Sequence, residues 1–203
     1  MAIDLESRTL QGLNAFIGLL LLNLLHLLCC LPLLTIGAAT SALFETLGRF
    51  VDDERGHLLR DYLRALVTNV LPATALHLVL GAPAAALGFA ALFWIRLDGL
   101  FSLVAAGITG LAALYLLAAW IHAQGLVAAF RAPLGRTLRN ALLLPGAEPL
   151  RTAGLVAVPA ALLAAALVVP GAPWFLLTLG ASLGGCVCVL LLRAVHRRAG
   201  TPA

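Results

Sequence analysis

The sequence predicts an all-α membrane protein with about five transmembrane helices and two amphipathic interfacial helices in the first loop between them. Two observations predict this class. Of 203 residues, 62% are apolar and only 11% are charged, whereas soluble domains have roughly 45–50% and 25%. Four runs without Asp, Glu, Lys or Arg hold 140 residues, namely 9–44, 65–95, 99–130 and 152–192. A membrane span needs about 20 such residues, so we expect a single integral membrane domain over 1–203.

The uncharged runs divide into five spans, which we place near 13–36, 67–93, 99–130, 152–169 and 174–192. The last run is too long for one crossing at about 1.5 Å per residue, and Pro170-Gly171-Ala172-Pro173 splits it with a tight turn. Trp94 and Trp174 lie at span ends, where interfacial aromatics are common. The first run lacks the basic start and the short apolar stretch of a signal peptide, so we interpret it as a retained span.

The charges predict an orientation. All 13 basic residues are Arg, and 11 of them lie in the loops 37–66 and 131–151 and in the tail after 192. Only Arg8 and Arg96 lie elsewhere. The positive-inside rule then predicts a multi-pass membrane protein with its N-terminus outside and its C-terminus cytoplasmic. No basic stripe interleaves with aromatics, so we expect no nucleic-acid partner.

The first loop predicts two interfacial helices, near 40–52 and 57–66. In the first, Leu43, Leu47 and Phe50 share one face, opposite Glu45 and Arg49. A charged turn at 52–56 separates it from the second. Such helices either pack against their own bundle at the membrane surface or dock in the groove of a partner.

A family resemblance lies in the segment from Asn23 to Gly37, Asn-Leu-Leu-His-Leu-Leu-Cys-Cys-Leu-Pro-Leu-Leu-Thr-Ile-Gly, followed by Ala-Leu-Phe at 42–44. It resembles the signature of the YesL-like bacterial membrane proteins, a family of unknown function. The matching motif residues are Asn23, Pro32, Thr35 and Gly37, whereas His26 replaces the usual aromatic residue. The resemblance implies about five spans, a place in the bacterial cytoplasmic membrane and no known chemistry. It also implies a place near carbohydrate uptake, because genes of the family often neighbour those of carbohydrate ABC importers.

The motif around Pro32 allows two interpretations. Proline removes a backbone donor and glycine permits unusual backbone geometry, so carbonyl groups freed near Thr35 and Gly37 could line a site, as in the broken helices of transporters. Alternatively, the helix simply kinks or stops there.

Polar side chains inside the spans are the best candidates for a binding site. His26, His77 and His122 lie 8–10 residues from the predicted cytoplasmic ends of their spans, which places them roughly 12–15 Å deep. Asn23 shares a helical face with His26. We therefore name Asn23, His26, His77 and His122 as candidate substrate-binding residues. They could instead be contacts between helices or, for His26 with Cys29 and Cys30, ligands of a soft metal. We expect neither a metal site nor a cofactor.

No nucleophile, base and orienting group occur together outside the spans, and no nucleotide-binding fingerprint is present, so we do not expect an enzyme. Two functional hypotheses remain. The first is an accessory component associated with carbohydrate uptake of the ABC type. The alternative is a small transporter or channel with a polar midplane site, although the five unequal spans show no internal repeat of the kind common in transporters.

Overall fold

The computed structural model describes residues 5–52 and 57–198, with side chains described for 12–52 and 57–195, and all regular secondary structure in these residues is helical. Five helical segments are long and apolar enough to cross a membrane: Gly12–Cys30, Leu58–Trp94, Leu100–Ala129, Pro149–Val168 and Ala172–Val195. The predicted fold class is therefore confirmed.

The first predicted span is shorter than expected. Helix α1 (Leu5–Cys30) stops before Pro32, and a single 3-10 turn, η1 (Leu33–Thr35), leads into α2 (Ile36–Val51). The prediction of one helix over 13–36 was wrong at its carboxyl end. The reason is that Pro32 has no backbone N–H and its ring clashes with the preceding turn of a helix, which disfavours continuation of α1.

The second span is longer than expected. Helix α3 (Leu58–Leu76) continues through a π-helix, η2 (His77–Gly81), into α4 (Ala82–Trp94). The amphipathic stretch predicted at 57–66 is therefore the first part of this span and not a separate helix. The turn predicted at 52–56 falls mostly on residues 53–56, which lie outside the described residues.

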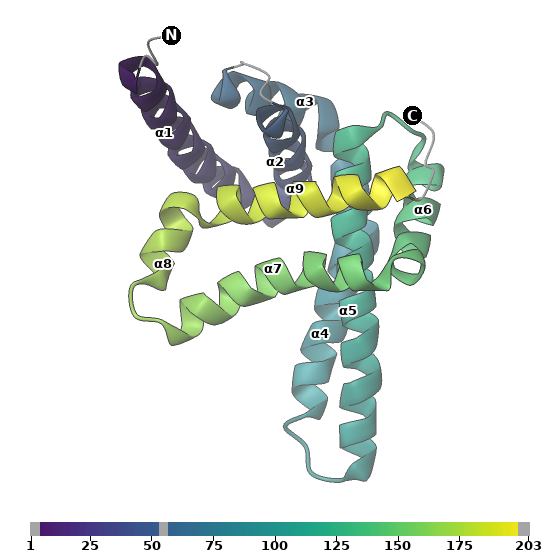
Figure 1. The fold of residues 1–203 in the computed structure, drawn as a ribbon. Helices are drawn as coiled ribbons and strands as arrows, with labels where there is room; N and C mark the ends of the chain where they lie inside the picture. Colours follow the sequence, from purple (N-terminus) through teal and green to yellow (C-terminus); the bar gives the residue numbers. More distant parts are fainter. Residues whose placement is uncertain (1–4, 53–56, 199–203) are drawn as a thin grey trace.

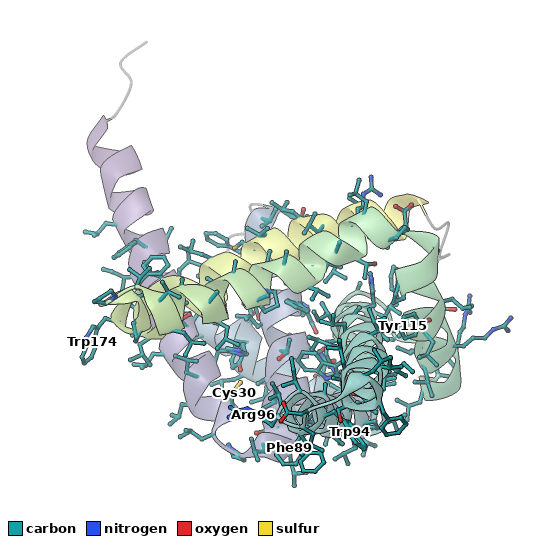
Figure 2. The ribbon with its side chains drawn as sticks, turned by 90° about the horizontal axis from the view of Figure 1, so that it is seen from below. Cys30, Phe89, Trp94, Arg96, Tyr115 and Trp174 are labelled. Carbon is teal, nitrogen blue, oxygen red and sulfur yellow. The ribbon has the colours of Figure 1, made fainter. Side chains whose placement is uncertain are left out.

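Helices α4 and α5 (Leu100–Ala129) form a long hairpin that projects from the rest of the molecule (Figure 1). Trp94 and Arg96 lie at its tip (Figure 2). Gly99 precedes α5 with φ of 114°, a conformation that only glycine adopts readily. After α5 the chain runs into the amphipathic helix α6 (Leu134–Ala147).

The last two spans are α7 (Pro149–Val168) and a segment made of α8 (Ala172–Phe175), the π-helix η3 (Leu176–Gly180) and α9 (Ala181–Arg198). They are joined by the predicted tight turn, in which Gly171 has φ of 93°. Helices α7 and α9 lie side by side and run across the carboxyl-terminal part of α5 (Figure 1). The five spans are therefore not a simple parallel bundle.

Helix α2 occupies the centre of the fold. It contacts α1, α3, α5 and α9, and nine of its sixteen residues are buried. The predicted apolar face, with Leu43 and Leu47, packs against Gly185 of α9. Of the two interpretations of the first amphipathic helix, packing within its own bundle fits the structure. The helix does not lie flat at the membrane surface with that face in lipid, because the other spans cover it.

Helix α2 runs back toward the end of the molecule at which α1 begins, so the start of α1 and the end of α2 lie at the same end (Figure 1). Gly18 of α1 lies against Leu58 at the start of α3, and His26 lies beside Tyr62 one turn later. Helices α1 and α3 therefore run in the same direction. The amino-terminal end of α1 therefore lies at the same end of the molecule as the end of α2, with Arg49, and the start of α3, with Arg60 and Arg64. This differs from the sequence-based topology, which assumed that residues 13–36 cross once and leave the chain on the opposite side.

Candidate functional site

The carbonyl groups at the break after α1 accept hydrogen bonds from a side chain of the same segment. Proline at position 32 interrupts the helical hydrogen bonds, and Thr35 Oγ1 donates to the carbonyl oxygens of Cys29 at 2.6 Å and Pro32 at 2.8 Å. Freed carbonyls are costly in an apolar environment unless they accept a hydrogen bond. The Pro32 and Thr35 pair therefore makes a satisfied helix stop, and these two carbonyls are already occupied by the Thr35 hydroxyl.

Gly37 allows α2 to approach α3 closely. A Cβ atom at Gly37 would lie 2.6 Å from both Ala73 O and His77 Cβ, closer than such atoms pack. Gln124 of α5 closes the same junction. With its amide oriented to satisfy both atoms, Nε2 donates to Gly37 O at 3.0 Å and Oε1 accepts from Trp120 Nε1 at 3.1 Å. The motif glycine thus marks the point where α2, α3 and α5 meet.

Asn23 is fully buried and joins α1 to the last span. Its Nδ2 donates to Leu176 O at 3.2 Å and Leu177 O at 2.7 Å, and its Oδ1 accepts from Ser182 N at 3.0 Å. Ser182 Oγ in turn donates to Leu19 O at 3.0 Å. A π-helix leaves some carbonyls without their usual helical donor, and Asn23 supplies that donor to η3.

His26 has a different set of neighbours. Its Nδ1 lies 3.4 Å from the Tyr62 hydroxyl and its Nε2 lies 3.6 Å from Cys30 Sγ. The rings of His26 and Tyr62 meet edge to face. Within the described part of the chain, no three His, Cys, Asp or Glu side chains gather as metal ligands. Cys29, the third residue of the metal interpretation, packs with the apolar core instead.

His77 is the first residue of η2 and packs edge to face against Trp120. Its Nδ1 is buried against Gly81 and has no hydrogen-bond partner among the described residues. The ring lines an apolar groove of about 400 Å³, which we call the His77 groove; its walls are Ile36, His77, Gly81, Ala84, Ala85, Gly88, Ala113, Leu114, Leu117 and Trp120.

His122 is fully buried on α5, and its Nε2 lies 2.9 Å from Thr152 Oγ1 of α7. The three histidines therefore face three different sets of helices: α1 with α3, η2 with α5, and α5 with α7. The structure keeps Asn23 and His26 on the same helix but directs them toward different neighbours. The four predicted site residues do not line one common cavity among the hollows described here.

A second hollow lies where α2, α3, α5 and α9 meet, at the Arg-rich end of the molecule. We call it the Arg-rich pocket. Its volume is about 350 Å³, and it is lined by Phe44, Glu45, Gly48, Arg49, Asp52, Asn69, Gly125, Val127, Ala128, Ala129, Phe130, Arg131, Val189, Leu192 and Arg193. The walls are half polar and half apolar.

The charged groups of the Arg-rich pocket are extensively paired. Arg193 reaches both carboxylate oxygens of Asp52, at 2.6 Å each, and ties the end of α2 to α9. These hydrogen bonds with Arg193 hold the pKa of Asp52 below its usual value. Glu45 accepts from Arg49 at 2.8 Å and from Asn69 Nδ2 at 2.9 Å. Two ion pairs, Asp52 with Arg193 and Glu45 with Arg49, therefore line the pocket.

Sequence reasoning missed this pocket. From the sequence, residues 52–56 are only a charged turn between two helices, and Glu45 is only part of the polar side of an interfacial helix. A usable signal was present: Ser41 and Glu45 are one helical turn apart, and Asn69 lies inside an uncharged run. Asn69 Nδ2 lies 3.3 Å from Ser41 Oγ, so the isolated polar residue of the second span marks its contact with α2.

The segment that contains the helix stop, the central helix and the long second span is also the segment with known relatives. Residues 19–91 match the family described as Protein of unknown function, DUF624. The match includes Asn23, Pro32, Thr35 and Gly37 and ends within α4. It covers about a third of the 203 residues, so the DUF624 similarity applies to this part and does not include α5 to α9. No curated protein and no solved structure matches the chain.

Proposed function

We propose that this protein is a non-enzymatic accessory component of the bacterial cytoplasmic membrane that works beside a carbohydrate importer of the ABC type. The observation that best supports an accessory role is the use of the interior polar side chains. Asn23, His26 and His122 each contact a neighbouring helix and line neither the His77 groove nor the Arg-rich pocket. Inside a membrane, such contacts hold helices together.

The carbohydrate part of the proposal is supported by the resemblance of residues 23–44 to the YesL-like proteins. That family implies a place near carbohydrate uptake through the neighbourhood of its genes. The DUF624 match over 19–91 includes the same segment, and the description of that family names no substrate.

For orientation, we propose that the Arg-rich side faces the cytoplasm. The Arg-rich pocket lies there, and so does the start of α6 with its exposed Arg136, as the positive-inside rule favours. Because α1 and α3 run in the same direction, the amino-terminal end of α1 shares this side. Reporters at both ends of the chain should then be active in the cytoplasm, and a reporter inserted at 95–99 should be external. An external amino-terminal reporter would instead support the original prediction of an outside N-terminus.

Crosslinking in native membranes tests the partner. Leu143 of α6 is 59% exposed near the exposed arginines, whereas Leu103 of α5 is 62% exposed on the projecting hairpin. A photoreactive amino acid at position 143 should capture a subunit of a carbohydrate importer, and deletion of the protein should reduce uptake of that carbohydrate. The same probe at position 103 should react with lipid. Normal uptake in the deletion strain would contradict the proposal.

One observation favours the alternative, a small transporter or channel. The π-helix η2 begins at His77 in the middle of a long span, and π-helices often occur at functional sites. The unpartnered Nδ1 lies beside the His77 groove. Purified protein in liposomes distinguishes the two functions. Solute flux by the protein alone that is lost in His77→Ala at normal protein content would support a transporter.

A further inference from the structure

In the Arg-rich pocket, the acidic hydrogen-bond acceptors are more completely paired than the arginine donors. Both oxygens of Asp52 accept from Arg193, and the two oxygens of Glu45 accept from Arg49 and from Asn69. The acidic groups that line the pocket are therefore already paired with donors of the protein itself.

The hydrogen-bond donors of the pocket, its arginines, are less completely paired than the carboxylates. Arg49 bonds to Glu45 through Nη2, and its side chain is 45% exposed. Arg131 is exposed and forms no ion pair with any other residue that the structure describes. A guanidinium carries five N–H donors, so Arg49 and Arg131, which both line the pocket, retain several donors for a ligand. Three arginines against two carboxylates also leave one net positive charge on the lining.

We propose that the Arg-rich pocket binds a phosphate-bearing anion, with Arg49 and Arg131 as its ligands. Guanidinium groups bind phosphate oxygens through paired, charge-assisted hydrogen bonds. The carbonyl groups at the end of α5 carry a partial negative charge that opposes an anion, which is why two cations are needed. Arg193 positions the site, because its pairing with Asp52 and with Gly48 O fixes α9 against α2.

The apolar residues of the lining suit a ligand that has an apolar part next to its phosphate. Phe44, Phe130 and Leu192 form a wall next to the arginines, where the glycerol and the first carbons of a lipid could lie. Basic pockets between helices at the cytoplasmic surface bind anionic lipid headgroups. A lipid headgroup and a free phosphate share the recognition chemistry, and the apolar wall favours the lipid. The inference is independent of any role in carbohydrate uptake.

Binding is measured on the full-length protein in a neutral detergent, from the shift of its thermal unfolding temperature. Three probes are titrated: short-chain phosphatidylglycerol, short-chain phosphatidylcholine and inorganic phosphate. We expect saturable stabilisation by phosphatidylglycerol and none by phosphatidylcholine. In Arg131→Gln the apparent affinity should fall about tenfold or more, since a lost hydrogen bond to a charged group costs at least that factor. Stabilisation by inorganic phosphate that equals that by phosphatidylglycerol would assign the site to free phosphate.

The matched control is Arg136→Gln, which removes an exposed arginine of α6 that does not line the pocket. It should bind like the unchanged protein. Arg131 has no ion pair to lose, so its replacement should leave unfolding without ligand unchanged; if Arg131→Gln does not fold, Arg131→Lys should still weaken binding by losing the paired geometry. Equal binding by the unchanged protein, the Arg131 variant and the Arg136 variant would overturn the proposal, and so would no binding of either anion.

Discussion

Helices α2 and α4 are both apolar, yet α2 buries nine of its sixteen residues, whereas α4 buries only Ala84 of its thirteen. The contrast extends to their surroundings. Helix α2 is enclosed by α1, α3, α5 and α9, and α4 packs mainly on α5 in a hairpin whose side chains face outward, among them Phe89 and Phe93. Hydropathy alone does not separate these two environments, because lipid and a protein core are both apolar.

Specific contacts mark the difference. The region around α2 contains polar hydrogen bonds between helices, such as those of Asn23 and Asn69, and a glycine that permits close approach at Gly37. In the hairpin, Thr109 bonds only to carbonyls of its own helix, and a Cβ atom at Gly107 would meet nothing within 4 Å. The α2 region should therefore be sensitive to single substitutions that the hairpin tolerates.

The largest contrast is expected for the glycines. Gly37→Ala places a methyl group 2.6 Å from the backbone oxygen of Ala73, so the helices must move apart, at a cost of about 1–3 kcal/mol in unfolding free energy. Gly107→Ala should be neutral or stabilising by up to about 1 kcal/mol, because alanine favours a helix. Denaturation of both purified variants in one detergent measures the difference. Equal stability of the two variants would contradict the close packing at Gly37.

Asn23→Leu should have the next largest effect. It removes the donor to Leu176 O and Leu177 O and leaves Ser182 N without its acceptor. We expect a loss of about 1–2 kcal/mol, together with faster proteolysis near residue 180. Thr109→Val in the hairpin is the control and should change stability by less than about 0.5 kcal/mol. Similar losses in both variants would show that Asn23 does not hold the last span.

Thr35→Val tests the helix stop with an almost isosteric side chain. The carbonyls of Cys29 and Pro32 lose the hydroxyl that donates to them, and we expect a cost of about 1 kcal/mol. Thr178→Val is the matched control, because its hydroxyl bonds only to carbonyls one turn earlier in its own segment. A cost no greater than that of Thr178→Val would mean that the freed carbonyls find another donor.

Asp52 gives a smaller effect that depends on pH. Its pKa is lowered in the folded protein by the hydrogen bonds with Arg193. The stabilisation is therefore present above the unfolded pKa of about 3.9 and is lost as pH falls through the lower folded value. Asp52→Asn should reduce the drop in unfolding temperature between pH 6 and pH 3. An identical drop in the variant and the unchanged protein would contradict the pairing.

Much of the fold could be predicted from the sequence because membrane spans depend on length and composition. The turn at Gly171 and the span Leu100–Ala129 match the predictions within a few residues. The prediction was wrong at residues 31–36, where Pro32 ends the helix, and for the separate helix at 57–66, which is part of the second span. An amphipathic pattern records one apolar face and does not say whether lipid or protein covers it.

The candidate site was predicted only in part. The sequence identified Asn23, His26, His77 and His122 as interior polar residues, and equal depth suggested a single layer. The depth of a residue along its span does not determine which neighbouring helix its side chain faces. The angle at which α9 crosses α5 (Figure 1) and the pairing of Asp52 with Arg193, 141 residues apart, depend on tertiary packing that no local pattern contains.

The most direct test of the account replaces His26, His77 and His122 by Asn together. Asparagine keeps a polar group at each position and removes the ring that could bind a proton. Carbohydrate uptake is measured in a deletion strain that expresses the triple variant and is divided by the amount of protein in the membrane. If these side chains hold helices together, uptake per molecule should equal that of the unchanged protein, even where the amount of protein falls. Loss of uptake at normal protein amount would contradict the account and assign the histidines to a transport site.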